Sequence, residues 1–484
     1  MWLLAICFDL VTPGTLAAAN EAARAGDVLE LQAGTYRTPI RPARSGEEGK
    51  PIVYRAEAGG RPVFTGLEVA IDLRGRSHVT FEGIAVEKVD RFLWAEESSH
   101  ITLSKCTFDT STVWESCRLK RMGDFLRVTD CVFRNGSDLL SIQGGSHHLI
   151  ENCTFDTASH TCLVLMGVER SVVRGNTLRN PDQKLMEVFT TREKDWKGEP
   201  RLSQFLVIEN NRFELAAGKD GHSGIQYAGN RSILRRNVFR SCGTGIEFTA
   251  YKSDAPEAHH NVSNRFYNNT VVACGGEGKH DTGVTLAPAM PDFSDQVFVN
   301  NIIAGNRCGD GRPAVQVALG WDAVPAHAIF RANDIVATKP GEDVFWWGDA
   351  KGKKTFTLQE YEAAWPKNAS LNIEAAPRFV DAEKGDFRLK AGCACIDAGV
   401  PLSAATEAGD GKVLRVDDAL FFSDGHGVSD GDAIRVGAEL VRVVAVDTEA
   451  RRLTLDRAIS WKAGAPVTLD FAGKAPDIGA FESR

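Results

Sequence analysis

The chain has 484 residues, of which 43% are hydrophobic and 25% are charged, which is an ordinary composition for a folded protein. The formal net charge of −8 argues against non-specific binding to nucleic acid or to anionic lipid. No run of residues approaches the roughly 18 apolar residues of a membrane span, so no membrane-spanning segment is expected.

The chain opens with the apolar run MWLLAICF, which has neither a basic segment nor a clear small-residue cleavage site. We interpret this run as the first strand and expect any export signal to be absent or already removed. A short amphipathic helix is expected next, within TLAAANEAARAGDV, and GDVLELQAGTY is expected to contain the first strand of a coil.

One phrase then recurs along most of the chain: an alternating apolar run, a small or polar marker residue, and an apolar residue two positions later. The spacing of 22 to 35 residues, with short strands in each unit, is typical of a solenoid, because each unit can bury its apolar face only against its neighbours. We expect the cysteines to stack as buried thiols and the asparagines to form a hydrogen-bonded ladder. The markers are Gly83, Cys106, Cys131, Cys153, Asn176, Asn211, Asn237, Asn269, Asn301 and Asn333.

The C-terminal part departs from this repeat. TLQEYEAAW, residues 357–365, predicts one short helix, and residues 411–470 alternate apolar and polar side chains with hairpin signals. We expect a small antiparallel β module there, capping the open end of the solenoid. The predicted organisation is a parallel β-helix with its N-terminal cap over 1–400, the module over 401–472, and a closing strand over 473–484.

The chain resembles the right-handed parallel β-helix proteins over roughly residues 10–400 and its last dozen residues. The opening TLAAANEAARAGDVLELQAGTYRTPI carries this resemblance, and GDFRLKAGCACIDAGVP and APDIGAFE look like the closing phrases of secreted bacterial members. The resemblance implies an all-β fold, a right-handed parallel β-helix, and a carbohydrate-active protein that is secreted or periplasmic.

Alignment of the rungs on their markers separates inward from outward side chains, since strand residues alternate between the two faces. Neighbouring rungs lie about 4.8 Å apart, so Glu187 and Glu247, predicted two rungs apart, are expected roughly 9.6 Å from each other. The predicted inward residues are Ile142, Val188, Ile225, Ile246, Phe248, Val284, Leu286 and Val317. The predicted outward column contains Gln143, Glu187, Gln226, Glu247, Thr285 and Gln316.

Long loops follow this column on successive rungs and are expected to wall a groove. Trp114 and Lys184 belong to the same walls. Aromatic faces stack on sugar rings, and basic groups pair with sugar carboxylates or sulfates, so the expected partner is an anionic polysaccharide. The predicted substrate-binding residues are Arg118, Lys120, Trp196 and Gln143.

The first functional hypothesis is a polysaccharide lyase that cleaves a uronic-acid polymer by β-elimination. This reaction needs charge neutralisation at the carboxylate, a base for the C5 proton, and a proton for the leaving oxygen. Glu187, Gln226 and Glu247 are candidate ligands of a Ca²⁺ ion that neutralises the carboxylate. The candidate catalytic residues are Lys252 and His222 as bases, Tyr251 and Arg192 at the leaving oxygen, and Glu187 and Glu247.

The N-terminal rungs also resemble the alginate lyase and chondroitinase B type of β-helix, a family that carries a calcium-binding acidic cluster. Two alternatives remain open. One is an inverting glycoside hydrolase, because its two carboxylates stand about 6.5–9.5 Å apart and Glu187 and Glu247 are expected near the top of that range. The other is a non-catalytic glycan-binding scaffold. A uronan epimerase is disfavoured because no Asp-Pro-His-Asp motif is present.

Overall fold

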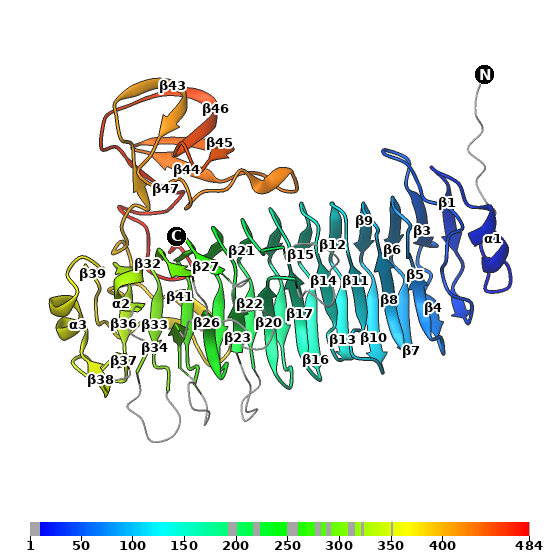
Figure 1. The fold of residues 1–484 in the computed structure, drawn as a ribbon, viewed down its shortest axis with the longest axis horizontal. Coiled ribbons are helices and arrows are strands. Elements are labelled where there is room, and N and C mark those ends of the chain that lie inside the picture. Colours follow the sequence, from blue (N-terminus) through cyan, green and yellow to red (C-terminus); the bar gives the residue numbers. More distant parts are fainter. Residues whose placement is uncertain are drawn as a thin grey trace. The chain divides into compact units, whose positions relative to one another are not determined.

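The computed structural model describes residues 10–191, 201–215, 223–248, 260–275, 282–286, 292–307, 315–320, 324–349 and 352–483. The chain divides into two compact units, 1–203 and 204–484. Each unit contains a coil of short parallel strands that are hydrogen-bonded from rung to rung into three sheets (Figure 1). The predicted all-β parallel β-helix is therefore confirmed, whereas the predicted opening strand in MWLLAICF lies outside the described residues.

In the first unit, the three sheets follow one another around each turn of the coil. The first sheet contains β1 (Val28–Leu31), β3 (Ile52–Ala56), β6 (Val79–Glu82), β9 (Ile101–Ser104), β12 (Leu126–Thr129), β15 (Leu149–Glu151) and β18 (Val172–Arg174). The second contains β2 (Gly34–Tyr36), β4 (Pro62–Thr65), β7 (Ala85–Val89), β10 (Thr107–Ser111), β13 (Val132–Gly136), β16 (Thr154–Ala158) and β19 (Thr177–Arg179). The third contains β5 (Val69–Asp72), β8 (Arg91–Glu96), β11 (Cys117–Lys120), β14 (Leu140–Gln143), β17 (Thr161–Met166) and β20 (Lys184–Phe189).

The second unit has the same arrangement. Its first sheet contains β21 (Val207–Glu209), β24 (Ile233–Arg235), β28 (Arg265–Tyr267), β32 (Gln296–Val299), β35 (Ala328–Arg331) and β39 (Ala369–Ser370). Its second contains β22 (Arg212–Glu214), β25 (Val238–Arg240), β29 (Thr270–Val272), β33 (Ile302–Ala304) and β36 (Asp334–Val336). Its third contains β23 (Ser223–Tyr227), β26 (Thr244–Phe248), β30 (Val284–Leu286), β34 (Val317–Gly320), β37 (Phe345–Asp349) and β38 (Gly352–Phe356). Outside these sheets lie the pairs β27 (His260–Val262) with β31 (Asp292–Ser294) and β40 (Phe379–Asp381) with β41 (Asp386–Leu389), and the short helix α2 (Val324–His327).

The predicted N-terminal helix is α1 (Leu16–Ala22), which packs on the start of the first coil. Leu16, Ala19 and Asn20 form its buried face. The Asn20 amide donates to the carbonyl of Pro39 and accepts from the Tyr54 hydroxyl, each at 2.9 Å. Because these bonds satisfy the one polar group on that face, the helix covers the apolar end of the coil without an unpaired buried amide.

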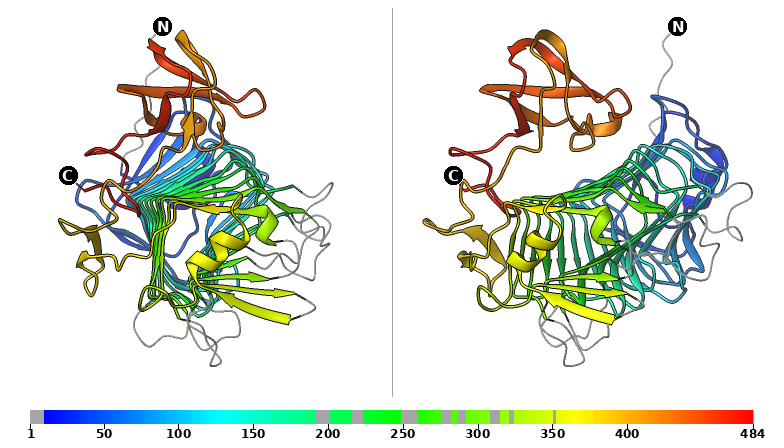
Figure 2. Two further views of the ribbon diagram at one scale, coloured as in Figure 1. Left: turned by 90° about the vertical axis from the view of Figure 1, so that its left-hand side faces the viewer. Right: turned by 60° about the vertical axis from the view of Figure 1, so that its left-hand side comes forward.

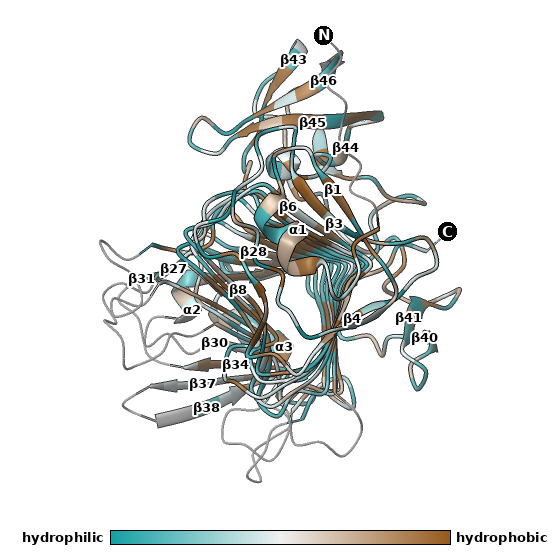
Figure 3. Ribbon diagram, turned by 90° about the vertical axis from the view of Figure 1, so that its right-hand side faces the viewer, coloured by the Kyte–Doolittle hydropathy of each residue, from teal (hydrophilic) through white to brown (hydrophobic). Residues whose placement is uncertain are grey.

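Hydrophobic residues recur along the strands of the coils (Figure 3), and most of the buried side chains are apolar. All eight residues predicted to point inward are fully buried, with no exposed surface. Phe108, Phe133 and Phe155 stack at successive ring-centroid distances of 4.7 and 5.0 Å, which match the spacing of the strands that carry them. The repeat therefore places equivalent side chains directly above one another within a unit.

The marker residues form the predicted buried ladder. In the first unit the backbone N–H of Cys131 donates to the sulfur of Cys153 at 3.4 Å. In the second unit each asparagine side chain accepts the backbone N–H of the previous marker, from Asn211 through Asn333. The ladder ends on Asn372, which lies 39 residues after Asn333, too far along the chain for the spacing to reveal it. All nine cysteines in the described part of the chain are free and buried.

The predicted outward column is wrong at two positions. Gln143 pairs in register with Met166, whereas Ser141 occupies the row that leads to Glu187. Gln316 precedes β34, and its side-chain oxygen accepts from the backbone and side chain of Asn306. The turns before these strands differ in length between rungs, so counting from the marker shifts the alignment by two residues.

The C-terminal part forms the predicted helix and antiparallel module. Helix α3 (Leu358–Ala364) begins at a capping box made by Thr357 and Glu360. The module is a sheet in the order β42 (Ser403–Ala404), β47 (Pro466–Leu469), β44 (Ala433–Val436), β45 (Glu439–Asp447), β46 (Arg452–Trp461) and β43 (Gly409–Arg415), with one 3₁₀ turn η3 (Gly425–Gly427). Figure 2 shows it as a small body beside the coil of the second unit.

Two expectations for this part are wrong. The Tyr361 ring of α3 stacks on Phe345 at 3.8 Å, so this helix covers the last rungs, while the module contacts the first sheet through Arg235 and Tyr267. The predicted closing strand is also absent, since residues 473–483 contain no strand. Instead Ile478 packs into an apolar cluster outside the second sheet, because the outward row Val272, Ala304 and Val336 is itself apolar.

A buried carboxyl in this cluster predicts pH-dependent stability. Burial raises the pKa of Asp334 to about 7, although the Ala375 N–H and the Cys395 thiol donate to it. Its unfolded value lies near 3.9, so the stabilisation is fully present below pH 4 and is lost as the pH rises through 7. Between pH 5 and pH 8, the free energy of unfolding in urea is expected to fall by about 2 kcal/mol less for Asp334→Asn than for the wild-type protein. Glu383→Gln, at an exposed carboxylate, is the control, and an equal pH profile for both variants contradicts the prediction.

Candidate active site

The outer face of the third sheet in the first unit carries one continuous row of side chains. The strand register links Asp72, Trp94, Arg118, Ser141, Val164 and Glu187 from β5 to β20. The predicted outward column requires equivalent strand positions to stay aligned from rung to rung. This alignment is confirmed within the first unit. Glu187 is only 3% exposed, so this row is a shielded surface and not the freely solvated stripe that alternation alone predicts.

A second row lies three residues earlier on the same rungs. It contains Glu115, Asp138, Thr161 and Lys184, which follow one another at intervals of 23 residues. Glu115 bridges to Asp138, and Thr161 pairs with Lys184. This row brings acidic and basic groups to the corner where each rung enters the third sheet.

An aspartate–histidine pair stands in this corner. His160 Nδ1 lies 2.6 Å from Asp138 Oδ1 and 3.2 Å from the Thr161 hydroxyl. Burial, reinforced by the negative charge of Glu187, raises the pKa of the Asp138 carboxyl, even though the contact with His160 opposes this shift. A carboxylate on Nδ1 fixes the imidazole tautomer that carries its proton there, and this tautomer leaves the Nε2 lone pair available as a base.

An exposed indole lies next to that base. Trp114 is 62% exposed, the highest value for a tryptophan in the described part of the chain, and its ring centroid is 4.5 Å from that of His160. Tryptophan rarely keeps so much apolar surface in water when it serves packing alone. Its free face is a platform on which a sugar ring can stack beside His160.

A lysine and a glutamate occupy the next rung. Lys184 Nζ lies 2.5 Å from Glu187 Oε1, and both side chains are nearly buried. The Lys184 backbone N–H also donates to the His160 carbonyl at 3.1 Å, so the ammonium-bearing strand is adjacent to the aspartate–histidine pair. The corner therefore combines a base, an ammonium group that is paired with Glu187, and an aromatic platform on neighbouring strands.

The predicted site residues are distributed over both units. Glu187 belongs to the first unit, and Gln226 and Glu247 belong to the second, so their predicted spacing stays a prediction. Arg118 forms an ion pair with Glu115 at 3.0 Å, Lys120 is largely buried, and the Gln143 amide donates to Glu115 at 3.3 Å. Five predicted residues lie outside the described part of the chain: Lys252, His222, Arg192, Tyr251 and Trp196.

Two of the three predicted calcium ligands, Gln226 and Glu247, lie together in the second unit, so only these two can be compared with a calcium site. Gln226 pairs in register with Glu247, and its side-chain oxygen is buried without a hydrogen-bond partner. Glu247 accepts from the Ser223 hydroxyl at 3.0 Å. A lone buried oxygen beside a carboxylate fits the oxygen-rich ligand set of Ca²⁺. Among the described residues, no group of three His, Cys, Asp or Glu side chains converges on one point.

Sequence reasoning missed Asp138 and His160. The 23-residue interval from Glu115 through Lys184 was visible as a signal, because it places charged groups at one position of successive rungs. His160 is displaced by one residue from this row, so spacing alone could not show that it faces Asp138. The predicted site was placed on later rungs because the long loops occur there.

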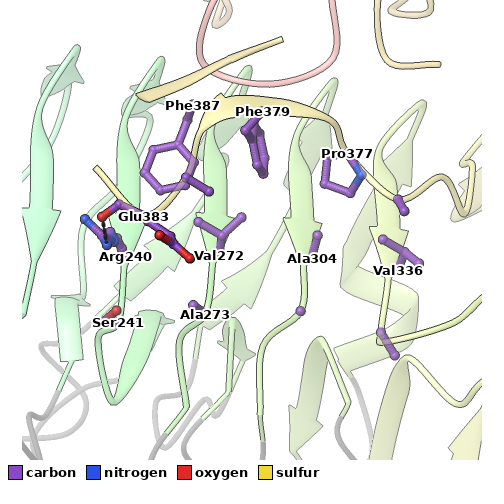
Figure 4. A pocket seen from close by; sticks show the side chains of 14 residues that line it. Arg240, Ser241, Val272, Ala273, Ala304, Val336, Pro377, Phe379, Glu383 and Phe387 are labelled. Carbon is purple, nitrogen blue, oxygen red and sulfur yellow. Dashed lines mark hydrogen bonds between the residues drawn. The ribbon is translucent and has the colours of Figure 1, made fainter. Parts of the chain in front are cut away.

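A separate hollow lies on the outer face of the second sheet in the second unit. It has a volume of about 410 Å³ and is bounded by the β40–β41 hairpin (Figure 4). Val272, Ala304 and Val336 form its floor, and Phe379 and Phe387 form its wall. Its charged lining residues are Arg240 and Glu383, and the Arg240 guanidinium donates to the backbone carbonyl of Glu383.

The comparisons with known proteins agree with this architecture. The family model described as the right handed beta helix region matches residues 69–318, which is more than half of the chain. The chain belongs to this family. The uncharacterized protein YwoF of Bacillus subtilis (strain 168) is 22% identical to this β-helix protein over 415 residues, covering 78% of this chain and 86% of YwoF.

Solved structures with this fold include several polysaccharide lyases. Pectate lyase Pel9A aligns over 98% of this β-helix protein and 96% of its own chain, with 15% identity and a TM-score of 0.46. A mannuronic acid specific family 6 lyase from human gut microbiota aligns over 77% and 92%, with 15% identity and a TM-score of 0.46. A variant of the alginate lyase AlyGC aligns over 79% and 55%, with 15% identity and a TM-score of 0.48.

The helices of the described segments are all too short or too polar to cross a membrane.

Proposed function

We propose that this protein is a polysaccharide lyase that cleaves a uronic-acid polymer by β-elimination at the outer face of the third sheet in the first unit. The observation that carries the proposal is the corner where the Asp138–His160 pair, Lys184 and the exposed Trp114 meet on adjacent strands. This combination supplies the base, the positive charge and the sugar platform that the reaction requires.

In the proposed mechanism, Trp114 stacks on a uronate ring and Lys184 pairs with its carboxylate, which makes the C5 proton more acidic. His160 Nε2 takes the C5 proton, the C4–O bond breaks, and the electron pair forms the C4=C5 double bond. The resulting imidazolium returns the proton to the leaving oxygen, while Asp138 holds the ring in place. One polymer thus gives a new hydroxyl end and one unsaturated end, and His160 is restored.

The reaction class is tested by incubating the protein with a panel of uronic-acid polymers and neutral glycans. Release of an ultraviolet-absorbing unsaturated product from a uronic-acid polymer is the expected result. New reducing ends without that absorbance would instead establish the inverting glycoside hydrolase. Binding without cleavage of any polymer would establish the glycan-binding scaffold. Polymers of this kind lie outside the cytoplasm, so the proposal includes a secreted or periplasmic location.

We also propose that Gln226 and Glu247 bind Ca²⁺ in the second unit. A bound ion would add positive charge for a polymer carboxylate there, and these two side chains would supply oxygen ligands. Millimolar Ca²⁺ is expected to raise the thermal unfolding midpoint, and Glu247→Gln is expected to remove this increase, because ligand binding stabilises the native state. Glu439→Gln, at an exposed carboxylate in the C-terminal module, is the control. A midpoint that is insensitive to Ca²⁺ would contradict the metal proposal.

A further inference from the structure

An arginine cluster surrounds one tryptophan on the early rungs of the same outer face. The guanidinium carbons of Arg74, Arg91 and Arg118 lie 4.3, 5.2 and 5.5 Å from the centroid of the Trp94 ring. A single cation over an indole is a familiar stabilising contact, but three like charges around one ring repel one another. The arrangement therefore needs anions close by.

Ion pairs occupy some of the arginines around Trp94 but not all of them. Asp72 accepts from Arg74 and also pairs with Arg41, and Glu115 pairs with Arg118 at 3.0 Å. Both of these carboxylates are therefore already engaged with other arginines of the cluster. The nearby Glu96 pairs with Arg121, which also contacts Glu97.

Arg91 is the least compensated member. It donates to the backbone carbonyl of Glu115, and within the described residues no carboxylate lies within ion-pair distance of its guanidinium. Burial lowers the pKa of Arg91, while the negative charge of Glu115 opposes this shift. A part-buried guanidinium with a single neutral acceptor retains several N–H groups that an oxyanion can use.

Unpaired donors point to the same shortage of acceptors. Trp94 Nε1 and Arg118 Nε are both buried and have no hydrogen-bond partner within the described part of the chain. Native proteins seldom leave such donors unsatisfied. Two of them in one cluster, together with the Arg91 guanidinium that lacks a carboxylate partner, indicate a surface completed by a ligand rich in acceptor oxygens.

We infer that Trp94, Arg91 and Arg118 form a second binding site that takes a carboxylate of the same polymer, several sugar units away from the cleaved bond. The inference rests on the proposed function. The strand register puts Trp94 three strands from the rung of β17, about 14 Å along the coil axis. A polymer lying along the third sheet therefore reaches both places, and the substrate must carry negative charge on successive units.

Isothermal titration of the His160→Ala protein tests this site without turnover. Hexamers of galacturonic acid and of mannuronic acid are the probes, and a glucose hexamer is the neutral control. We expect one uronate hexamer to bind and the glucose hexamer not to bind. Adding Arg91→Gln is expected to weaken uronate binding roughly tenfold and to make its salt dependence shallower, because one charge-assisted contact is lost.

Two further variants separate recognition from folding. Arg91→Lys keeps the positive charge and is expected to restore the salt dependence, which a purely structural role of Arg91 would not do. Arg134→Gln removes an arginine that pairs with Asp109 on the second sheet, and it is expected to leave hexamer affinity unchanged. Uronate affinity that is equal in the His160→Ala protein with and without Arg91→Gln, or no uronate binding at all, would overturn the inference.

The outcome is distinguishable from that of the proposed function. Arg91-dependent binding of a uronate hexamer without any unsaturated product from the wild-type protein would support the anion site and refute the lyase. Unsaturated product with Arg91-independent binding would support the lyase and refute the anion site.

Discussion

Replacing His160 with alanine is expected to lower the rate of unsaturated product formation roughly 10²–10⁴-fold, the range typical of a lost general base. The reason is geometric: His160 is held by Asp138 at 2.6 Å and stands beside the exposed Trp114, where a sugar ring can reach its Nε2 atom. The measurement is initial-rate ultraviolet absorbance on the uronic-acid polymer that the wild-type protein cleaves.

Three comparisons make this prediction specific. Asp138→Asn is expected to lower the rate less than His160→Ala, because it disturbs the tautomer and orientation but leaves the base in place. Added imidazole is expected to restore part of the activity of His160→Ala, which repacking around a structural histidine would not explain. His147→Gln is the matched control, since His147 stacks on Phe125 away from this corner. Full activity of His160→Ala would remove His160 from the mechanism.

Replacing Asp432 with alanine is expected to destabilise the second unit by about 3–5 kcal/mol, the usual cost of removing one partner of a buried ion pair. Asp432 belongs to the C-terminal module and receives two hydrogen bonds from the Arg235 guanidinium, at 2.5 and 2.7 Å. Arg235 is only 5% exposed and retains Glu209 as its remaining carboxylate. Burial works to lower the pKa of Arg235, but the charges of Asp432 and Glu209 raise it well above the usual value. Removing Asp432 therefore takes away the largest compensation for a buried charge.

Urea unfolding of Asp432→Ala and of Asp447→Ala provides the comparison. Asp447 pairs with Arg452 within the same module, but both side chains are 44% exposed, so its loss is expected to cost less than about 1 kcal/mol. Equal destabilisation by the two variants would show that the buried Arg235–Asp432 pair does not anchor the module.

Much of the fold could be predicted because the repeat has a visible marker. Asn269 or Cys153 sits at a corner where only a small hydrogen-bonding side chain fits inside the coil, so its position fixes which neighbours face inward. Counting from the marker therefore predicted correctly that Ile246 and Val284 are buried. The helix over 357–365 was predictable for a similar reason, because Thr357 and Glu360 form a local capping box.

The candidate site was harder to predict because it depends on turn lengths. The turns before the third sheet vary between rungs, so Gln143 was assigned to the row that Ser141 occupies. His160 lies at the end of such a turn and contacts Asp138 of the previous rung, a pairing that only the folded register defines. The lack of a carboxylate partner for Arg91 was also invisible, because it depends on which carboxylates already pair with other arginines.

The most direct measurement of the central claim is a crystal structure of the His160→Ala protein with a bound uronate hexamer. The account predicts a sugar ring stacked on Trp114, with its C5 atom facing position 160 and its carboxylate at Lys184. A hexamer bound on the outer face of the second sheet, or in the hollow beside Phe379, would contradict the account.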